Sequence, residues 1–241
     1  MTETRARVIR KPGALRGGVR LRLETEKAQR LLHGRRAGDG KPMIVGLMLF
    51  AAKVGRIWEA AAQDDPYADW WLLDIEHELQ MAKEGIAAYR KRVRQALESA
   101  PSVDIAVAVS LEPVEIELRF GTPYGFMGSY LLADYDQLVR EALTARHVAL
   151  MDREATERLI QEGGRAVRRA FNASDGYRYL GLTREDVRQG TAKARKAKEL
   201  MGEVPAPVVE GRMRARHAPP RRRRGREPEA AEASAGGGGA A

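Results

Sequence analysis

The sequence predicts an α+β fold that is mainly helical, with a short β-ribbon and several long amphipathic helices. Residues 18–24, in "GVRLRLE", alternate apolar and charged side chains with the two-residue period of a half-buried strand. Residues 72–98 instead carry apolar side chains at helical spacing along one continuous stripe. The 241 residues, of which 44% are hydrophobic, are enough to build one large domain or two small ones.

The first strand leads directly into a short helix. Thr25 is the expected N-cap of this helix, which runs from residue 26 to about Leu32. A second helix is predicted near 42–62, and it is apolar on most faces. Asp65 precedes a proline, which is typical of a helix start, so the long helix is expected to run from there to about Ser99. Its stripe can pack against its own domain or against a second subunit.

A β-hairpin is predicted from 103–111 and 114–120, two runs that alternate apolar residues and are joined by Glu-Pro. A helix or a pair of helices is expected near 128–150. Another helix is expected at 153–172, with Asp152 as its cap and a break at its Gly-Gly pair. A capping box formed by Thr183 and Asp186 begins a final helix that is expected to reach about Met201.

The net charge of +9 arises mainly from the two ends of the chain. Residues 1–17 carry five Lys/Arg against one Glu, and residues 205–241 carry eight Arg against four Glu. We therefore expect a flexible basic arm (1–17), a globular domain (18–204) and a disordered Pro/Arg/Gly-rich tail (205–241). A net positive charge favours binding to nucleic acid. The run "RRRRGR" would add attraction to phosphates that is independent of DNA sequence.

Composition argues against several other classes of protein. The chain has no cysteine, its longest apolar run is too short to span a bilayer, and its first residues lack a signal peptide. We expect a soluble, cytoplasmic protein that has no membrane partner and no cofactor.

No constellation of residues points to an enzyme, because the sequence contains no Ser–His–acid pattern and no Walker-type phosphate loop. "DIEHEL" (74–79) only weakly resembles a metal site, and an exposed polar face explains it better. In "DDPYADWW" (64–71) the acids could hold a cation. The preferred interpretation is a helix cap followed by aromatic residues that fill a junction between helices.

The strand at 18–24 carries the best functional signal. A two-stranded ribbon can enter the DNA major groove, and in ribbon-helix-helix proteins each subunit supplies one strand that two helices follow. Arg20 and Arg22 lie on the open side of this strand, and arginine can pair with guanine through two hydrogen bonds. The alternative is an ordinary surface strand whose arginines meet Glu24 or solvent. The strand at 114–120 is also followed by helices, but its glutamates would repel phosphates.

Five further arginines are candidate phosphate contacts: Arg30, Arg35, Arg165, Arg168 and Arg169. The last three lie on one predicted helical side, since positions three and four apart share a face. The usual explanation of such clusters is a solvated helix face.

Long blocks of the sequence resemble a known family. They are "LETEKAQRLLHGR", "GLMLFAAKVGRIWEAAAQDDPYADWW", "SYLLADYDQLVREALTARHVALMDREATERLIQEGGRAVRRAF" and "GYRYLGLTREDVRQGTAKARKAKELMGEVP". Together they are similar to integrating-conjugative-element proteins related to the transcriptional regulator AcaB, over about 14–220.

The resemblance implies a bacterial DNA-binding regulator, expected to be an activator of conjugative transfer genes on such an element or a plasmid. It implies a fold related to ribbon-helix-helix proteins and a homodimer on double-stranded DNA at the nucleoid, in possible contact with the transcription machinery. The alternative is a non-catalytic accessory or structural protein of the conjugation machinery that docks a protein partner.

Overall fold

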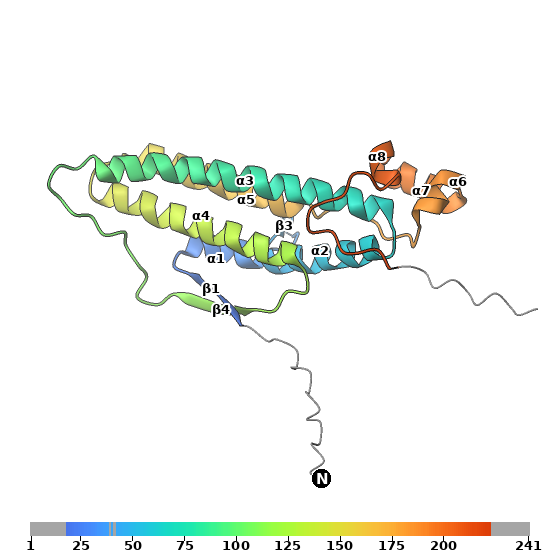
Figure 1. Ribbon diagram of the computed structural model, residues 1–241. Helices are drawn as coiled ribbons and strands as arrows, with labels where there is room; N and C mark the ends of the chain where they lie inside the picture. The colour runs from blue at the N-terminus through green and yellow to red at the C-terminus, as the bar shows by residue number, and fades with distance from the viewer. Residues whose placement is uncertain (1–17, 39, 41, 223–241) are drawn as a thin grey trace, which may run out of the picture.

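The computed structural model describes residues 18–38, 40 and 42–222, which form a helical body with two small antiparallel sheets (Figure 1). In chain order the elements are β1 (Val19–Leu23), α1 (Glu26–His33), β2 (Gly34–Arg35), β3 (Ile44–Val45), α2 (Leu47–Ala62), α3 (Pro66–Glu98), β4 (Val114–Leu118), α4 (Pro123–His147), α5 (Arg153–Asn172), α6 (Arg184–Gln189), α7 (Ala192–Met201) and α8 (Ala206–Val209). The prediction of a mainly helical fold is confirmed.

The core lies between the long helices α3, α4 and α5, with α1 and α2 packed beside them. The predicted stripe of α3 is buried at Leu72, Ile75, Leu79, Ala82, Ile86 and Val93. The stripe therefore packs within its own chain rather than against a second subunit. The predicted start of α3 is also confirmed, because the Asp65 carboxylate accepts from the backbone N–H groups of Tyr67 and Ala68.

The predicted hairpin of 103–111 with 114–120 is wrong. β4 pairs antiparallel with β1, so that Arg20 lies opposite Glu117 and Arg22 opposite Glu115. Residues 103–111 have no strand partner among the described residues. Neither Glu112 nor Pro113 tolerates the positive φ that a tight two-residue hairpin turn requires. The pairing of β4 with β1 instead buries apolar side chains of both strands against the helices. The two candidate ribbon strands are thus the two halves of one ribbon within a single chain. The expected dimeric ribbon, in which each subunit supplies one of these strands, is therefore not what β1 and β4 form.

A close backbone approach that requires glycine shapes the region near α1. The second helix begins at Leu47 rather than near 42, because Ile44–Val45 pair with Gly34–Arg35. The backbones come so close there that a Cβ on Gly34, whose φ is +69°, would lie 2.2 Å from the carbonyl oxygen of Ile44.

The Gly163–Gly164 pair does not break its helix, because α5 continues through it without interruption. A Cβ on Gly163 would lie 2.8 Å from Cδ2 of Leu138, and one on Gly164 would lie 3.0 Å from the hydroxyl of Tyr135. The two glycines therefore allow α5 to pack closely on α4.

The C-terminal part differs from the prediction in two ways. The expected single helix 184–201 is divided into α6 and α7 at Gly190, which has a left-handed φ of 63°. Residues 205–222 are also ordered on the helical body, where Val208 and Ala215 are buried, so a disordered tail cannot begin at residue 205. The predicted tail beyond residue 222 and the predicted arm 1–17 lie outside the described residues.

Candidate nucleic-acid interface

The β1–β4 ribbon lies on the surface of the helical body, below α1 and α4 in Figure 1. One face of the ribbon packs inward through Leu21, Leu23 and Leu118, each no more than 6% exposed. The other face carries Arg20 and Arg22, whose side chains are 71% and 53% exposed. The period-two pattern of the strand thus places both arginines in solvent, as the sequence predicts.

A buried carboxylate fixes the junction between β1 and α1. Asp136 of α4 accepts from the backbone N–H of Glu24 at 3.0 Å, and from the backbone N–H and hydroxyl of Thr25 at 2.9 and 2.7 Å. The Thr25 hydroxyl in turn caps α1 by accepting from the N–H of Ala28. The ribbon is therefore held in a defined position relative to the helices.

The exposed arginines face carboxylates of their own chain. Arg20 lies 3.5 Å from Glu115 across the ribbon, and Arg22 lies 2.8 Å from Glu24. The pKa of Glu24 is lowered, first by the hydrogen bond from the backbone N–H of Ser110 and then by Arg22. The glutamates that make β4 the poorer candidate thus lie beside the arginines of β1, and the charges on this face nearly cancel.

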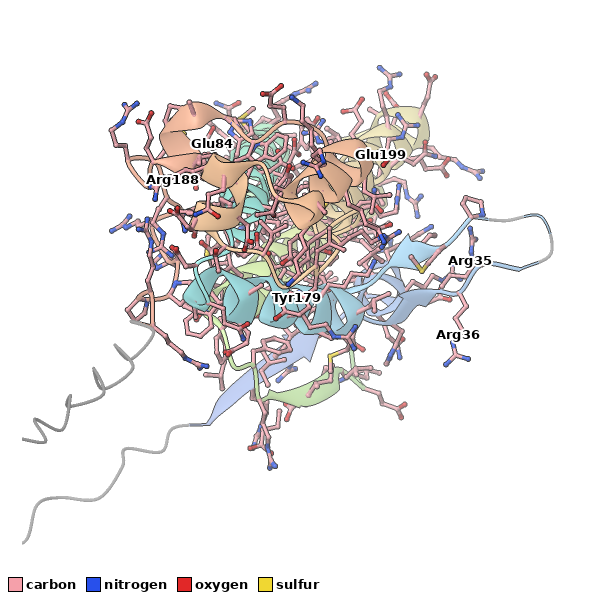
Figure 2. The ribbon with its side chains drawn as sticks, turned by 90° about the vertical axis from the view of Figure 1, so that its right-hand side faces the viewer. Arg35, Arg36, Glu84, Tyr179, Arg188 and Glu199 are labelled. Atoms are coloured by element: carbon pink, nitrogen blue, oxygen red, sulfur yellow. The ribbon has the colours of Figure 1, made fainter. Side chains whose placement is uncertain are left out.

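Three of the five candidate phosphate contacts meet around one hollow of about 420 Å³, which we call the α1–α5 hollow. Its wall includes Arg30 of α1, Arg35 of β2 and Arg168 of α5, together with Lys27 of α1 and Tyr135 of α4. The sequence analysis did not single out Lys27, although it precedes Arg30 by three residues and so shares its helix face. In Figure 2, Arg35 and Arg36 project from the side of the molecule in the β2–β3 region.

The other two candidates lie elsewhere on α5. Arg169 turns toward α3 and forms an ion pair with Glu78 at 2.8 Å, while Arg165 is exposed and does not line the hollow. The three arginines that share a predicted face therefore do not form one cluster. The side chains of Arg168 and Arg169 reach toward different neighbouring helices.

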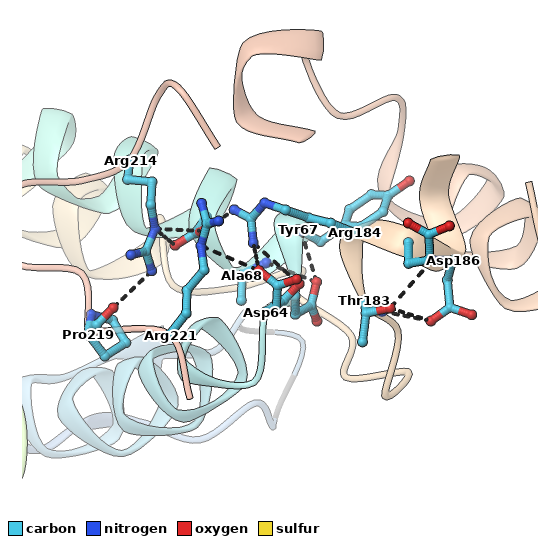
Figure 3. A network of polar contacts seen from close by, with 12 residues as sticks. Asp64, Tyr67, Ala68, Thr183, Arg184, Asp186, Arg214, Pro219 and Arg221 are labelled. Atoms are coloured by element: carbon cyan, nitrogen blue, oxygen red, sulfur yellow. Dashed lines mark hydrogen bonds and ion pairs between the residues drawn. The ribbon is translucent and has the colours of Figure 1, made fainter. Parts of the chain in front are cut away.

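The acids of "DDPYADWW" hold cations supplied by the chain itself (Figure 3). Asp69 is fully buried and binds the guanidinium groups of Arg184 and Arg214, and Asp64 lies 2.6 Å from Arg184 and 3.3 Å from Arg221. Arg184, at the start of α6, is only 2% exposed and cannot contact a phosphate. The predicted aromatic junction is also present, since Tyr67, Trp70 and Trp71 pack against one another and against the C-terminal helices.

Burial also affects the capping carboxylate of this segment. It raises the pKa of Asp65 to about 6, against the opposing effect of a 2.6 Å hydrogen bond from the Tyr177 hydroxyl. Asp65 thus serves as a helix cap and as an acceptor for a second segment of the chain.

A metal site at "DIEHEL" gains no support, because Glu78 is already paired with Arg169. The described residues contain no group of three or more His, Asp or Glu side chains arranged to bind a metal ion. Among the same residues, no helix combines the length and the apolar character that a membrane span requires.

The fold is similar to that of a solved structure. It matches the crystal structure of selenomethionine-containing AcaB from uropathogenic E. coli with a TM-score of 0.53 and 15% sequence identity. The match covers 80% of this chain and 96% of that one, and at this identity it establishes the fold alone. A comparison with curated proteins finds no match.

The family model described as transcriptional regulator AcaB matches residues 11–222, which is most of the chain. The protein is thus of the transcriptional-regulator class. It belongs to the AcaB family, which confirms the resemblance carried by the sequence blocks.

Proposed function

We propose that the protein regulates transcription by binding double-stranded DNA with the β1–β4 ribbon. The observation that carries the proposal is the exposed pair Arg20 and Arg22 on a two-stranded ribbon whose other face is fixed to the body. The major groove of B-DNA is wide enough for such a ribbon, and alternate side chains then meet base edges. The proposed relation to ribbon-helix-helix proteins rests on the order of elements, since each strand of the ribbon leads into helices.

The carboxylates around the arginines do not prevent such binding. An exposed ion pair contributes about 0–1 kcal/mol, whereas a bidentate arginine–guanine contact contributes about 1–3 kcal/mol of discrimination. Arg20 would therefore exchange Glu115 for guanine at a net gain. Glu24, whose side chain is only 8% exposed, would keep the hydrogen bond from the backbone N–H of Ser110 when Arg22 turns to guanine. Glu115 and Glu117 could then accept from cytosine amino groups, which is the usual base contact of a carboxylate.

The remaining arginines are proposed as contacts to the DNA backbone: Arg30, Arg35, Arg165, Arg168 and Arg169. Phosphate contacts fix the position of a protein on the duplex without specifying sequence. Arg169 would have to exchange Glu78 for phosphate, and Arg30 would have to exchange Glu26, so these two are expected to contribute less than the other three.

We also propose that the protein acts as a homodimer that pairs through residues 103–111. The N–H groups of Ala108 and Ser110 donate to side chains of the body, Thr144 and Glu24. In an extended segment the neighbouring residues, Val107 among them, direct their backbone groups to the opposite side. Val109 and Leu111 are 63% and 98% exposed, so this edge resembles an unpaired strand open to a partner.

A second copy of the segment fits this edge. In an antiparallel pair centred on Val107, Ile105 lies opposite Val109 and Val103 opposite Leu111, so that apolar side chains meet. Val107→Pro removes a backbone donor and is expected to shift the mass measured by light scattering from dimer to monomer. Val107→Thr keeps the donor and the β-branched shape and should remain dimeric. An unchanged mass in the proline variant, or a monomeric wild type, would contradict this interface.

The proposed targets are the transfer genes of a conjugative element, with the protein acting as an activator at the nucleoid in contact with the transcription machinery. This part of the proposal rests on the resemblance of the sequence blocks to integrating-conjugative-element proteins. The competing proposal, an accessory protein that docks a partner of the conjugation machinery, predicts no enrichment on DNA.

Genome-wide crosslinking of the tagged protein tests DNA binding and does not require the operator sequence to be defined. The wild type is expected to be enriched at discrete promoter sites. The double variant Arg20→Ala with Arg22→Ala should keep its helical circular dichroism. Its preference for those sites over unrelated DNA should fall by about 30-fold or more, since two bidentate contacts of at least about 1 kcal/mol are lost.

A matched control is Arg153→Ala with Arg158→Ala, because these arginines of α5 are also exposed and ion-paired. The control should retain full enrichment. The proposal fails if the wild type shows no enriched sites, or if the ribbon variant binds them as the wild type does.

A further inference from the structure

The α1–α5 hollow combines a small volume with a concentration of positive charge. Its volume of about 420 Å³ is within the range of pockets that bind small molecules. Four of its lining side chains, Lys27, Arg30, Arg35 and Arg168, are cationic, and none of the lining side chains is a carboxylate. The hollow therefore differs from the β1–β4 ribbon, where arginines and glutamates alternate.

Most of this charge is not neutralised within the described part of the chain. Arg30 pairs with Glu26 on the exposed side of α1 at 2.5 Å. Lys27 and Arg168 form no ion pair with any carboxylate among the described residues, and Arg35 donates to the backbone oxygen of Pro42. Like charges gathered around a hollow repel one another, so the arrangement favours a bound anion.

The cations come from separate elements whose positions are fixed. Arg168 is brought to the hollow by α5, which can approach Tyr135 only because positions 163 and 164 are glycine. Lys27 and Arg30 lie on α1, which is anchored through Thr25 to Asp136. Because these supports hold the cations in place without a ligand, little ordering is required when an anion binds.

We propose that the α1–α5 hollow is a binding site for a phosphate group. Guanidinium groups match the oxygens of phosphate in a bidentate manner, and lysine adds a further point charge. A phosphodiester of the DNA backbone carries one negative charge, whereas a phosphate monoester carries about two. The excess of cations thus fits a phosphate monoester or diphosphate best, and a backbone phosphate is the other source of the same chemistry.

Titration calorimetry with inorganic pyrophosphate tests the site independently of any operator. At constant ionic strength, pyrophosphate is expected to bind the wild type at one site and to raise its Tm. Arg168→Gln and Lys27→Gln should each weaken binding at least about tenfold, because each removes a cation without adding charge. The control Arg158→Gln, on an exposed part of α5, should bind as the wild type does.

A short mixed-sequence duplex then identifies the source of the phosphate. If the duplex displaces pyrophosphate and Arg168→Gln weakens both, the hollow takes a backbone phosphate. If pyrophosphate binds and the duplex does not displace it, the ligand is a free phosphorylated molecule. The proposal is overturned if pyrophosphate fails to bind the wild type, or if Arg158→Gln weakens binding as much as Arg168→Gln does. Loss of promoter enrichment in the ribbon variant would leave these outcomes unchanged.

Discussion

Replacing Asp69 with alanine tests whether the ion network at the start of α3 holds the C-terminal segment on the helical body. The Asp69 carboxylate is fully buried and binds two guanidinium groups, one from Arg184 of α6 and one from Arg214 of the segment that follows α8. Without it, Arg214 loses its carboxylate partner, and Arg184 keeps only Asp64, at 2.6 Å.

The size of the effect follows from burial. Removing one partner of a buried ion pair costs about 3–5 kcal/mol, because the other charge stays buried without compensation. Arg184 is 2% exposed but still faces Asp64, so the cost for Asp69→Ala is expected at the lower end, about 3 kcal/mol. For a chain of this size such a loss lowers Tm by about 6–12 °C.

Thermal unfolding followed by circular dichroism measures this change, with Glu199→Ala as the control because Glu199 is exposed. Limited trypsin digestion should also cleave within 205–222 faster in the Asp69 variant, since its arginines are no longer held. An Asp69 variant whose Tm and cleavage rate equal those of the wild type would refute the structural role of the network.

Two further predictions concern helix packing and the pH dependence of stability. Gly163→Ala places a Cβ 2.8 Å from Leu138 and should lower the free energy of unfolding in urea by about 1–3 kcal/mol, whereas Gly85→Ala, in open space on α3, should raise it by about 0.5–1 kcal/mol. Equal effects of the two alanines would contradict the packing argument. Burial raises the pKa of Asp65 to about 6 from 3.8, so the native state keeps a proton that the unfolded chain releases. The free energy of unfolding should therefore fall by up to about 3 kcal/mol as the pH rises from about 4 to about 6. Asp65→Asn keeps the cap and should remove this slope in urea titrations at several pH values, and an unchanged slope would exclude Asp65 as its origin.

Local features of the fold could be predicted from the sequence because their chemistry is local. The caps at Thr25, Asp65 and Asp152 each accept from a backbone N–H two or three residues away, and the capping box at Thr183 depends on Asp186 in the same way. Spacing along the chain is sufficient information for such contacts.

Pairings between distant segments could not be predicted in this way. The partner of β4 is about a hundred residues away, and the choice between β1 and 103–111 depends on which pairing buries apolar side chains on the helices. The Gly163–Gly164 pair has the composition of a helix break, and only the position of Tyr135 shows that it permits close packing.

In the candidate nucleic-acid interface, too, local features could be predicted and contacts between distant segments could not. The exposure of Arg20 and Arg22 follows from the period of the strand, but their carboxylate neighbours on β4 do not. Arg30, Arg35 and Arg168 are separate candidates in the sequence, and only the fold brings them around one hollow. The burial of Arg184 could not be predicted, because nothing in its helix indicates the buried Asp69 opposite.

The course of residues 211–222 determines how the basic C-terminus can be studied by deletion. Arg214, Arg221 and Arg222 reach back to Asp69, Asp64 and Glu59 across the turn between α2 and α3. A truncation that stops before residue 222 would remove structural ion pairs together with positive charge, so a loss of activity would have two causes. A chain shortened after Arg222 separates the two, and it is the version in which the arginine run can be assessed for its own effect.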